Sequence, residues 1–361
     1  MNKISIVALE SIRDIAIKTN DYLKKINNQK EDFLVETEEI RFSNGEGKIK
    51  LLNTIRGKNV YIMTDIGNHS ITYKMYGYEN HKSPDDHLED AKRVISAIRG
   101  HADSITLIMP LLYASRQHRR KGRESLDCAI ALKELENLGV KSIITFDVHD
   151  ENIQNVVPLM AFENFFPTVN IINEILTNEQ IDYENTIIIS PDTGAFNRAR
   201  YYADMLKVDV GIFHKRRDLT KVVNGKNPVI AHEYLGKDVN SKDCIVVDDM
   251  IASGESMLDV ATELKRRGAR NIYLASTFGL FCNGKDVFDK EYENNSFNRV
   301  YTTNLTYVSE NIKKSIWYKD VDCSIFIGKI INQLSNNYSI TPLLQGDPDA
   351  FKDVQKKLLK R

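Results

Sequence analysis

The strongest chemical signal in the sequence lies in residues Cys244–Ala269, CIVVDDMIASGESMLDVATELKRRGA. An apolar run ends in two adjacent carboxylates, Asp248 and Asp249, and a turn of small residues then leads into apolar side chains at helical spacing. Such a turn presents backbone N–H groups at the positive end of the helix dipole, which suits a phosphate. The carboxylates could accept hydrogen bonds from the hydroxyls of an attached sugar. We therefore predict a sugar-phosphate site, with an ordinary acidic turn and helix N-cap as the alternative.

Two clusters of cationic side chains each follow an apolar run that is typical of a buried strand. Guanidinium groups bind phosphate oxygens through paired N–H donors, so either cluster could hold a polyphosphate. A solvated basic surface is the alternative for both. The clusters are Arg116, Arg119, Arg120, Lys121 and Arg123, and Lys215, Arg216 and Arg217.

Two further side chains after apolar runs suit a phosphate or a metal ion. His149 lies between Asp147 and Asp150, and a carboxylate there could fix the tautomer of a histidine that contacts a phosphate oxygen or a metal. Asp192 supplies the oxygen that Mg²⁺ prefers, directly or through water. A structural histidine and a turn-capping aspartate are the alternatives.

The segment RFSNGE, residues 41–46, combines a ring with polar side chains. Phe42 could stack on a nucleotide base, and Asn44 and Glu46 could form hydrogen bonds with its edge. A hairpin with an ordinary core phenylalanine is the alternative.

The elements that must position these residues alternate between short apolar runs and amphipathic segments, which is typical of parallel strands joined by crossover helices. We predict a polar tail over 346–361 after two α/β domains, over 1–167 and 168–345. Residues 218–241 are rich in Lys, Asn, Gly and Asp, and are expected to form a long mobile loop, or flap. The predicted strands are 59–64, 104–111, 142–148, 186–190, 208–213, 244–247 and 271–276, with helices over 88–98 and 129–138.

The composition is that of a folded enzyme. The 361 residues are 42% hydrophobic and 27% charged, and 49 Lys and Arg face 50 Asp and Glu. No overall field would draw the molecule to nucleic acid or a membrane surface, so any anion site must be local. The four cysteines are widely spaced, and we find neither a signal peptide nor a long apolar span, so we expect a cytoplasmic protein with free thiols.

The loop VVDDMIASGES resembles the phosphoribosyl-diphosphate loop of type I phosphoribosyltransferases and of the ribose-phosphate pyrophosphokinase family, and further segments resemble only the second. RFSNGE resembles its adenine-binding segment, YASRQHRR its Y-A-R-Q-D-R-K region, and FDVHDENIQ its D-L-H-A-x-Q-I-Q region. SPDTGAFNRAR and HKRRD resemble its S-P-D-x-G and D-K-R-R segments, and TTNLTY and ITPLL also match. The segments occur in the family's order, so the resemblance covers most of the chain.

The resemblance implies two phosphoribosyltransferase-type domains and transfer of a diphosphoryl group from MgATP to ribose 5-phosphate. It also implies Mg²⁺ and a homo-oligomer, a hexamer built from dimers, in which the adenine segment reaches the site of an adjacent subunit. Lys215 and Arg217 match the main transition-state stabilisers. The implied ATP contacts are Phe42, Asn44, Glu46, Arg116 and Gln117, the ribose 5-phosphate contacts are Asp248, Asp249, Ala252, Ser253, Gly254, Glu255 and Ser256, and the metal-associated residues are His149 and Asp192.

Four positions depart from the family's pattern. His118 and Ala252 each stand where the family usually has Asp, Glu163 replaces the Asp of V-D-N-L, and Glu255 replaces Gly or Ala. Backbone donors at Ala252 do not depend on a side chain, but a carboxylate at Glu255 would repel a phosphate unless it turns outward. Two alternatives therefore stay open: a non-catalytic regulatory paralogue that assembles with an active synthetase, and a phosphoribosyltransferase.

Overall fold

The structure is a computed structural model that describes residues 3–98, 100–120, 122–217 and 229–359. The chain forms two compact units. Unit 1 comprises Met1–Pro167, Asn304–Tyr307 and Asp322–Pro348, and unit 2 comprises Thr168–Thr303, Val308–Val321 and Asp349–Arg361. Unit 1 therefore includes two segments from the last fifth of the chain.

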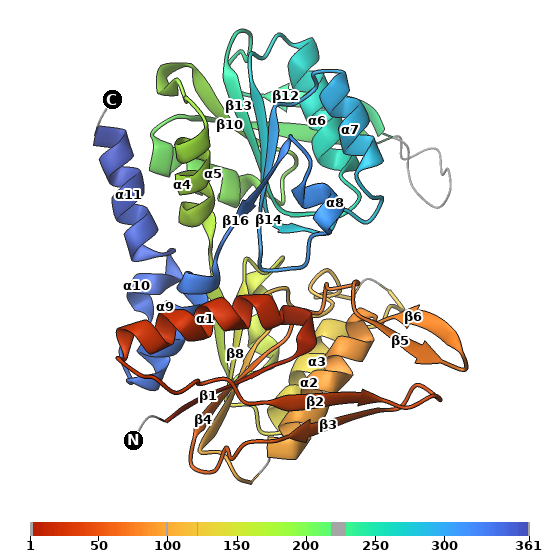
Figure 1. Cartoon of the computed structure of the whole chain (residues 1–361). Helices are drawn as coiled ribbons and strands as arrows, with labels where there is room; N and C mark the ends of the chain where they lie inside the picture. The colour runs from red at the N-terminus through yellow and green to blue at the C-terminus, as the bar shows by residue number, and fades with distance from the viewer. Residues whose placement is uncertain (1–2, 99, 121, 218–228, 360–361) are drawn as a thin grey trace. The chain divides into compact units, whose positions relative to one another are not determined.

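Unit 1 contains a five-stranded parallel sheet in the order β1-β4-β7-β8-β9 (Figure 1). Four of its strands, β1, β4, β7 and β8, are mainly apolar and nearly wholly buried, as expected where helices cover a parallel sheet, whereas the edge strand β9 is only partly buried. The strands are β1 Ile4–Ala8, β4 Asn59–Met63, β7 Ser104–Ile108, β8 Ser142–Phe146 and β9 Ala161–Phe165. Two antiparallel hairpins accompany them, β2 Thr37–Arg41 with β3 Gly47–Leu51, and β5 Thr72–Met75 with β6 Tyr78–His81.

The helices of unit 1 come from both ends of the chain. The N-terminal helix α1 packs against α9, which belongs to the returning segment 322–348 (Figure 1). The ring of Phe326 in α9 lies 5.8 Å from that of Phe146 and 6.0 Å from that of Phe165. The core of unit 1 therefore depends on α9. The helices are α1 Arg13–Ile26, α2 Pro84–Ile98, α3 Asp127–Asn137, α9 Ser324–Ser335 and α10 Thr341–Leu344, with 3-10 turns η1 Glu10–Ile12 and η2 Glu151–Val156.

Unit 2 contains a seven-stranded sheet in the order β12-β11-β10-β13-β14-β15-β16. All neighbours are parallel except β12, which pairs antiparallel with β11 at one edge. The strands are β10 Thr186–Ser190, β11 Asp209–Arg217, β12 Val229–Leu235, β13 Asp243–Ile251, β14 Ile272–Gly279, β15 Arg299–Thr303 and β16 Tyr318–Val321. The helices are α4 Thr168–Asn178, α5 Phe196–Leu206, α6 Glu255–Arg266, α7 Asp286–Glu293, α8 Glu310–Lys313 and α11 Pro348–Leu359, with the 3-10 turn η3 Tyr183–Asn185.

Two hydrophobic cores cover the two faces of the second sheet, because side chains of a strand alternate between faces. Ile187 and Ile189 of β10 belong to the core with α6, α7 and α8, whereas Ile188 belongs to the core with α4, α5 and α11. Figure 1 shows the two groups of helices on opposite sides of this sheet. The fully buried Val354 attaches α11, which forms most of the expected polar tail.

The prediction of two α/β units with mainly parallel, helix-flanked sheets is confirmed, and each predicted strand overlaps an observed one. The expected loop over 218–241 is not a loop throughout, because residues 229–235 form β12; residues 218–228 lie outside the described part of the chain. The stacking of Tyr234 on Phe213, with ring centroids 5.1 Å apart, holds β12 against β11. No helix in the described ranges is long and apolar enough to cross a bilayer.

Candidate active site

The predicted sugar-phosphate loop joins β13 to α6 in unit 2. Gly254 immediately precedes α6 with φ +90°, a left-handed conformation that side chains strongly disfavour. A Cβ atom there would also collide with the ring of Phe288. Both constraints select glycine, which leaves the first N–H groups of α6 without a capping side chain from the N-cap position.

The departures at Ala252 and Glu255 fit this local geometry. Ala252 is half-buried, and its carbonyl accepts a hydrogen bond from the Cys282 N–H at 2.8 Å, which fixes the backbone of the loop without an aspartate. Glu255 is the first residue of α6 and is exposed, so its carboxylate can remain in water. A negative charge in the first turn of a helix is also favoured by the helix dipole.

Replacing Gly254 with alanine is expected to destabilise the protein by about 2–5 kcal/mol and to weaken the binding of a sugar phosphate at this loop at least about tenfold. The left-handed backbone costs an alanine about 1–2 kcal/mol, and displacing Phe288 costs about 1–3 kcal/mol more. Gly284→Ala is the matched control, because Gly284 has φ +74° but open space around its Cβ position. Urea unfolding measures the loss of stability and titration with a sugar phosphate measures the loss of binding; equal losses in the two variants would contradict the role of Phe288.

The carboxylates at the end of β13 lie in a negatively charged environment. The Asp248 side chain is 22% exposed, and its Oδ1 accepts the Asp249 N–H at 2.9 Å and lies 3.9 Å from Nη1 of Arg198. Burial, and then the charge of Asp249, raise the pKa of Asp248 to about 7, against the opposing charge of Arg198. Asp192 also raises this pKa, so the three carboxylates interact. Hydroxyl donors or a cation would relieve this charge.

We expect the unfolding free energy to fall by about 2–4 kcal/mol as pH rises from 4 to 7, through Asp248 alone. The folded state binds a proton at Asp248 up to pH about 7, whereas the unfolded chain releases it near pH 4, so raising the pH favours unfolding. Urea midpoints between pH 4 and 8 should show a weaker dependence in Asp248→Asn than in the wild type. The exposed Asp204→Asn serves as control, and parallel curves for Asp248→Asn and the wild type would refute the assignment.

Neighbouring strands bring three of the predicted groups to one edge of the second sheet. Strands β11, β10 and β13 are adjacent and parallel, and Lys215, Asp192 and Asp248 come from their carboxyl-terminal ends. The pairing of β10 with β11 ends at Ile212, and beyond it the backbone of Lys215 pairs opposite His232 of β12. Lys215 and Arg217 therefore belong to a two-stranded extension of the sheet, and the register shifts between Arg216 and Arg217.

Arg198 is the site residue of unit 2 that sequence reasoning missed. It lies in the first turn of α5, six residues after Asp192. Helix α5 follows β10, the strand next to β13, and Arg198 contacts Asp248 of β13 from there. Its signal was present in the segment SPDTGAFNRAR, in which a cation follows the turn aspartate by less than two helical turns. Arg198 keeps the carboxylate pair from being a purely anionic site.

In unit 1, the predicted adenine segment is the turn between β2 and β3. Phe42 is 48% exposed, so it is not the core residue that the alternative required. Its N–H donates to the Glu46 carbonyl at 2.8 Å, and Asn44 Oδ1 accepts the Glu46 N–H at 3.1 Å. The turn is therefore well ordered and presents an exposed ring, as stacking on a base requires.

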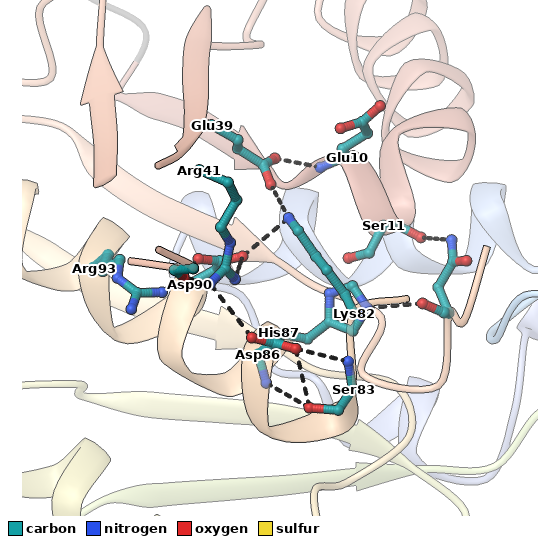
Figure 2. A network of polar contacts seen from close by, with 12 residues as sticks. Glu10, Ser11, Glu39, Arg41, Lys82, Ser83, Asp86, His87, Asp90 and Arg93 are labelled. Carbon is teal, nitrogen blue, oxygen red and sulfur yellow. Dashed lines mark hydrogen bonds and ion pairs between the residues drawn. The ribbon is translucent and has the colours of Figure 1, made fainter. Parts of the chain in front are cut away.

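A largely buried network of charges fixes this turn to α2 (Figure 2). Asp90, 2% exposed, accepts from Arg41 at 2.8 Å, from Lys82 at 3.0 Å and from Arg93 at 2.7 Å. Lys82 also pairs with Glu39 at 2.9 Å. Burial would raise the pKa of Asp90, but the charge of Lys82, its hydrogen bond and the charge of Arg41 outweigh burial and lower it. Sequence periodicity gave no sign of this network.

The hairpin β5–β6, which was not predicted, packs against the same turn. The Tyr76 N–H donates to the Ser43 carbonyl at 2.8 Å, and the guanidinium of Arg41 lies 5.1 Å from the ring centre of Tyr73. The nucleotide segment is thus supported by two elements remote from it in sequence.

The other predicted residues of unit 1 follow the adjacent strands β7 and β8. Arg116 and Gln117 are exposed in the loop after β7, and His149 is exposed in the loop after β8. His118 joins the two loops: its Nε2 lies 3.1 Å from Asp150 Oδ2, and its ring centre lies 5.5 Å from that of His149. Unit 1 thus brings the basic segment and the predicted metal-associated histidine together.

The donor chemistry of both units suits Mg²⁺ only in part. Within the described ranges, no three His, Cys, Asp or Glu side chains are grouped as a metal cage. The carboxylates of Asp192 and Asp248 nevertheless interact and supply the hard oxygen atoms that Mg²⁺ prefers. Mg²⁺ usually completes its shell with water and substrate phosphates, so a few carboxylates fit it without a protein cage.

Comparisons with known families account for both units. Residues 4–139 match the family described as the N-terminal domain of ribose phosphate pyrophosphokinase, and residues 168–306 match the phosphoribosyl transferase domain. Proteins named ribose-phosphate pyrophosphokinase are 28% identical over 310 residues in Buchnera aphidicola and 29% identical over 308 residues in Haemophilus ducreyi. Each similarity covers 84% of this chain and 89% of the relative.

The fold is also similar to a solved structure. A phosphoribosylpyrophosphate synthetase from Mycobacterium smegmatis superposes with a TM-score of 0.75 at 21% sequence identity. The similarity covers 93% of this chain and 99% of the other. It supports the assignment of both α/β units to one known architecture.

Proposed function

We propose, from the premise that this chain belongs to the ribose-phosphate pyrophosphokinase family, that it forms 5-phosphoribosyl 1-diphosphate and AMP from MgATP and ribose 5-phosphate. The C1 hydroxyl oxygen of the sugar bonds to the β-phosphorus of ATP, the bond from that phosphorus to the α,β-bridging oxygen breaks, and the hydroxyl proton is released. The observation that carries the proposal is that one chain holds both an exposed-ring turn beside α2 and a sugar-phosphate loop before α6. A phosphoribosyltransferase needs only the second.

The loop before α6 binds the sugar phosphate in this proposal. Backbone N–H groups of residues 252–256 hold the 5-phosphate, because they lie at the positive end of α6. Asp248 and Asp249 accept hydrogen bonds from the ribose hydroxyls, which also relieves their mutual repulsion. Ala252 is compatible with this function since its contribution is a backbone donor.

Phosphoryl transfer gathers negative charge on the equatorial and bridging oxygens, so catalysis is mainly positioning and electrostatic stabilisation. Lys215 and Arg217 supply positive charge from the extension of β11, next to the loop that follows β10. Phe42, Asn44 and Glu46 bind the adenine, and Arg116 and Gln117 the phosphates of ATP. The chain needs no side-chain nucleophile for this reaction.

Asp192 in unit 2 and His149 in unit 1 are the residues that would each contact Mg²⁺ bound to substrate phosphate oxygens. When bound, it cancels charge on the triphosphate and makes the phosphorus easier to attack. Asp192 is oriented for such a task, because its Oδ1 accepts the N–H groups of Gly194 at 2.8 Å and Ala195 at 3.1 Å. These bonds fix the carboxylate at the end of β10.

A homo-oligomer is part of the proposal. The exposed Phe42 ring fits a role at the site of an adjacent subunit, which is the arrangement that the family resemblance implies. Light scattering on the purified protein at several concentrations would measure the mass of the assembly, for which we expect a hexamer.

The test of the function is AMP formation from MgATP with and without ribose 5-phosphate, with the sugar product identified by ³¹P NMR. We expect AMP only when the sugar is present, in equal amount to 5-phosphoribosyl 1-diphosphate. Folded protein that forms no AMP over a range of Mg²⁺ and phosphate concentrations would refute the proposal and favour a regulatory partner. Consumption of 5-phosphoribosyl 1-diphosphate with a free base would favour a transferase.

A further inference from the structure

The contacts of His118 are unusual for a side chain in a basic loop. Its Nδ1 lies 3.1 Å from the Ser115 carbonyl oxygen, and its Nε2 lies 3.1 Å from Asp150 Oδ2. The imidazole is only 10% exposed and the Asp150 side chain 26% exposed. Both ring nitrogens thus face oxygen acceptors, so the ring has one defined orientation.

The two carboxylate oxygens of Asp150 make different contacts. Its Oδ1 accepts the Asn152 N–H at 3.0 Å and caps the turn η2, while its Oδ2 faces His118. The carboxylate therefore joins the loop after β7 to the loop after β8 through a single side chain. Asp150 directly follows His149, so the position of one sets that of the other.

The pair has charged and aromatic neighbours on both loops. Asp150 interacts electrostatically with His118 and Arg119, and the ring of His149 lies beside that of His118. Arg119 follows His118 in the chain and is exposed, so it cannot replace the ring as a partly buried partner. The His118–Asp150 contact therefore links the two loops, together with the contact between the rings of His118 and His149.

The sequence supports the pairing independently. The segment YASRQHRR has histidine where the similar Y-A-R-Q-D-R-K has aspartate, and FDVHDENIQ has aspartate where D-L-H-A-x-Q-I-Q has alanine. The two differences fall on the two residues that touch. A change to aspartate at 118 alone would place two carboxylates together, which is unfavourable at short range.

We propose that His118 is a positioning residue, which through Asp150 holds the His149 loop in register with Arg116 and Gln117 for MgATP binding. The inference rests on the proposed function only for its kinetic consequence. His118 does not contact the reacting atoms in this proposal. Histidine at 118, where the family has aspartate, is accompanied by aspartate at 150, where the family has alanine, so that each change compensates for the other.

The test is a double-mutant cycle of His118→Asp, Asp150→Ala and the double variant, read by MgATP binding without sugar and by KM and kcat. We expect each single variant to weaken MgATP binding roughly tenfold, with KM for ribose 5-phosphate changed less than about twofold. The double variant should recover to within about threefold of the wild type. The control is His101→Asp, the same change at an exposed histidine that contacts Arg56.

The outcomes separate this inference from the proposed function. Single variants that bind MgATP like the wild type, or a double variant as weak as the singles, would overturn the positioning role. A wild type that binds MgATP but forms no AMP would refute the proposed function. In that case the MgATP affinities of the four proteins in the mutant cycle would still test the role of His118. A folded wild type that does not bind MgATP would overturn both. Urea unfolding of all variants excludes misfolding as the cause.

Discussion

Replacing Lys215 with alanine is expected to lower kcat for sugar-dependent AMP formation about 10²–10³-fold, with the free energy of unfolding changed by less than about 1 kcal/mol. The reason is that a fixed cation stabilises charge that develops only in the transition state, so its loss affects kcat more than KM. The backbone of Lys215 lies past the last residue of β11 that pairs with β10.

The matched control is Lys237→Ala, at a lysine that follows β12 and pairs with a residue of β11. Lys237 pairs with Asp209 at 2.9 Å and is 68% exposed, so its removal should leave kcat within about twofold. Steady-state assays with both substrates saturating measure the two variants side by side. If Lys215→Ala keeps the wild-type kcat, the electrostatic role assigned to the β11 extension is wrong.

Replacing Asp90 with alanine is expected to lower the unfolding free energy by about 3–5 kcal/mol, the loss typical when one partner of a buried ion pair is removed. Asp90 contacts three cationic side chains, and Lys82 is itself only 6% exposed. Without the carboxylate, Glu39 is left to balance Lys82 and Asp86 is left to balance Arg41, in a region with little water. Chemical denaturation at neutral pH measures the loss.

The control for Asp90 is Asp353→Ala. Asp353 pairs with Lys356 at 3.0 Å, but both side chains are more than half exposed, so removal should cost at most about 0.5 kcal/mol. The Asp90 variant should also bind MgATP more weakly, since Arg41 directly precedes Phe42. Equal stability losses in the two variants would show that water compensates the network.

The elements that were predicted share one physical property. Parallel strands are buried on both faces and therefore appear as continuous apolar runs, as in the segments that became β4, β8 and β10. Some of the strands that were missed lack such runs: β12 follows a polar stretch, and β5–β6 is an exposed hairpin with Tyr76 and Gly77 at its turn. The strand β1 was missed although its sequence, ISIVA, is apolar and buried. In edge strands and hairpins, buried and exposed side chains alternate along the strand, and this alternation is hard to recognise when most of the residues are polar.

The candidate site divides in the same way. Groups at strand ends, such as Asp192 and Asp248, could be located because parallel strands end at one edge of a sheet. The side chains that orient such groups could not be located in the sequence. Arg41 contacts Asp90 and His118 contacts Asp150, but no periodic pattern in the sequence relates the two members of either pair. The sequence therefore locates candidate groups at strand ends better than it locates the side chains that hold them in place.

The return of residues 322–348 to unit 1 has a consequence for synthesis on the ribosome. The rings of Phe146 and Phe165 acquire their partner Phe326 only when α9 has been translated. At about 5–20 residues per second, the N-terminal segment waits roughly ten to thirty seconds after Pro167 before its core can close. During that interval its apolar surface is exposed to chaperones and to other nascent chains, so the order of translation, and not only the final contacts, governs the yield of folded protein.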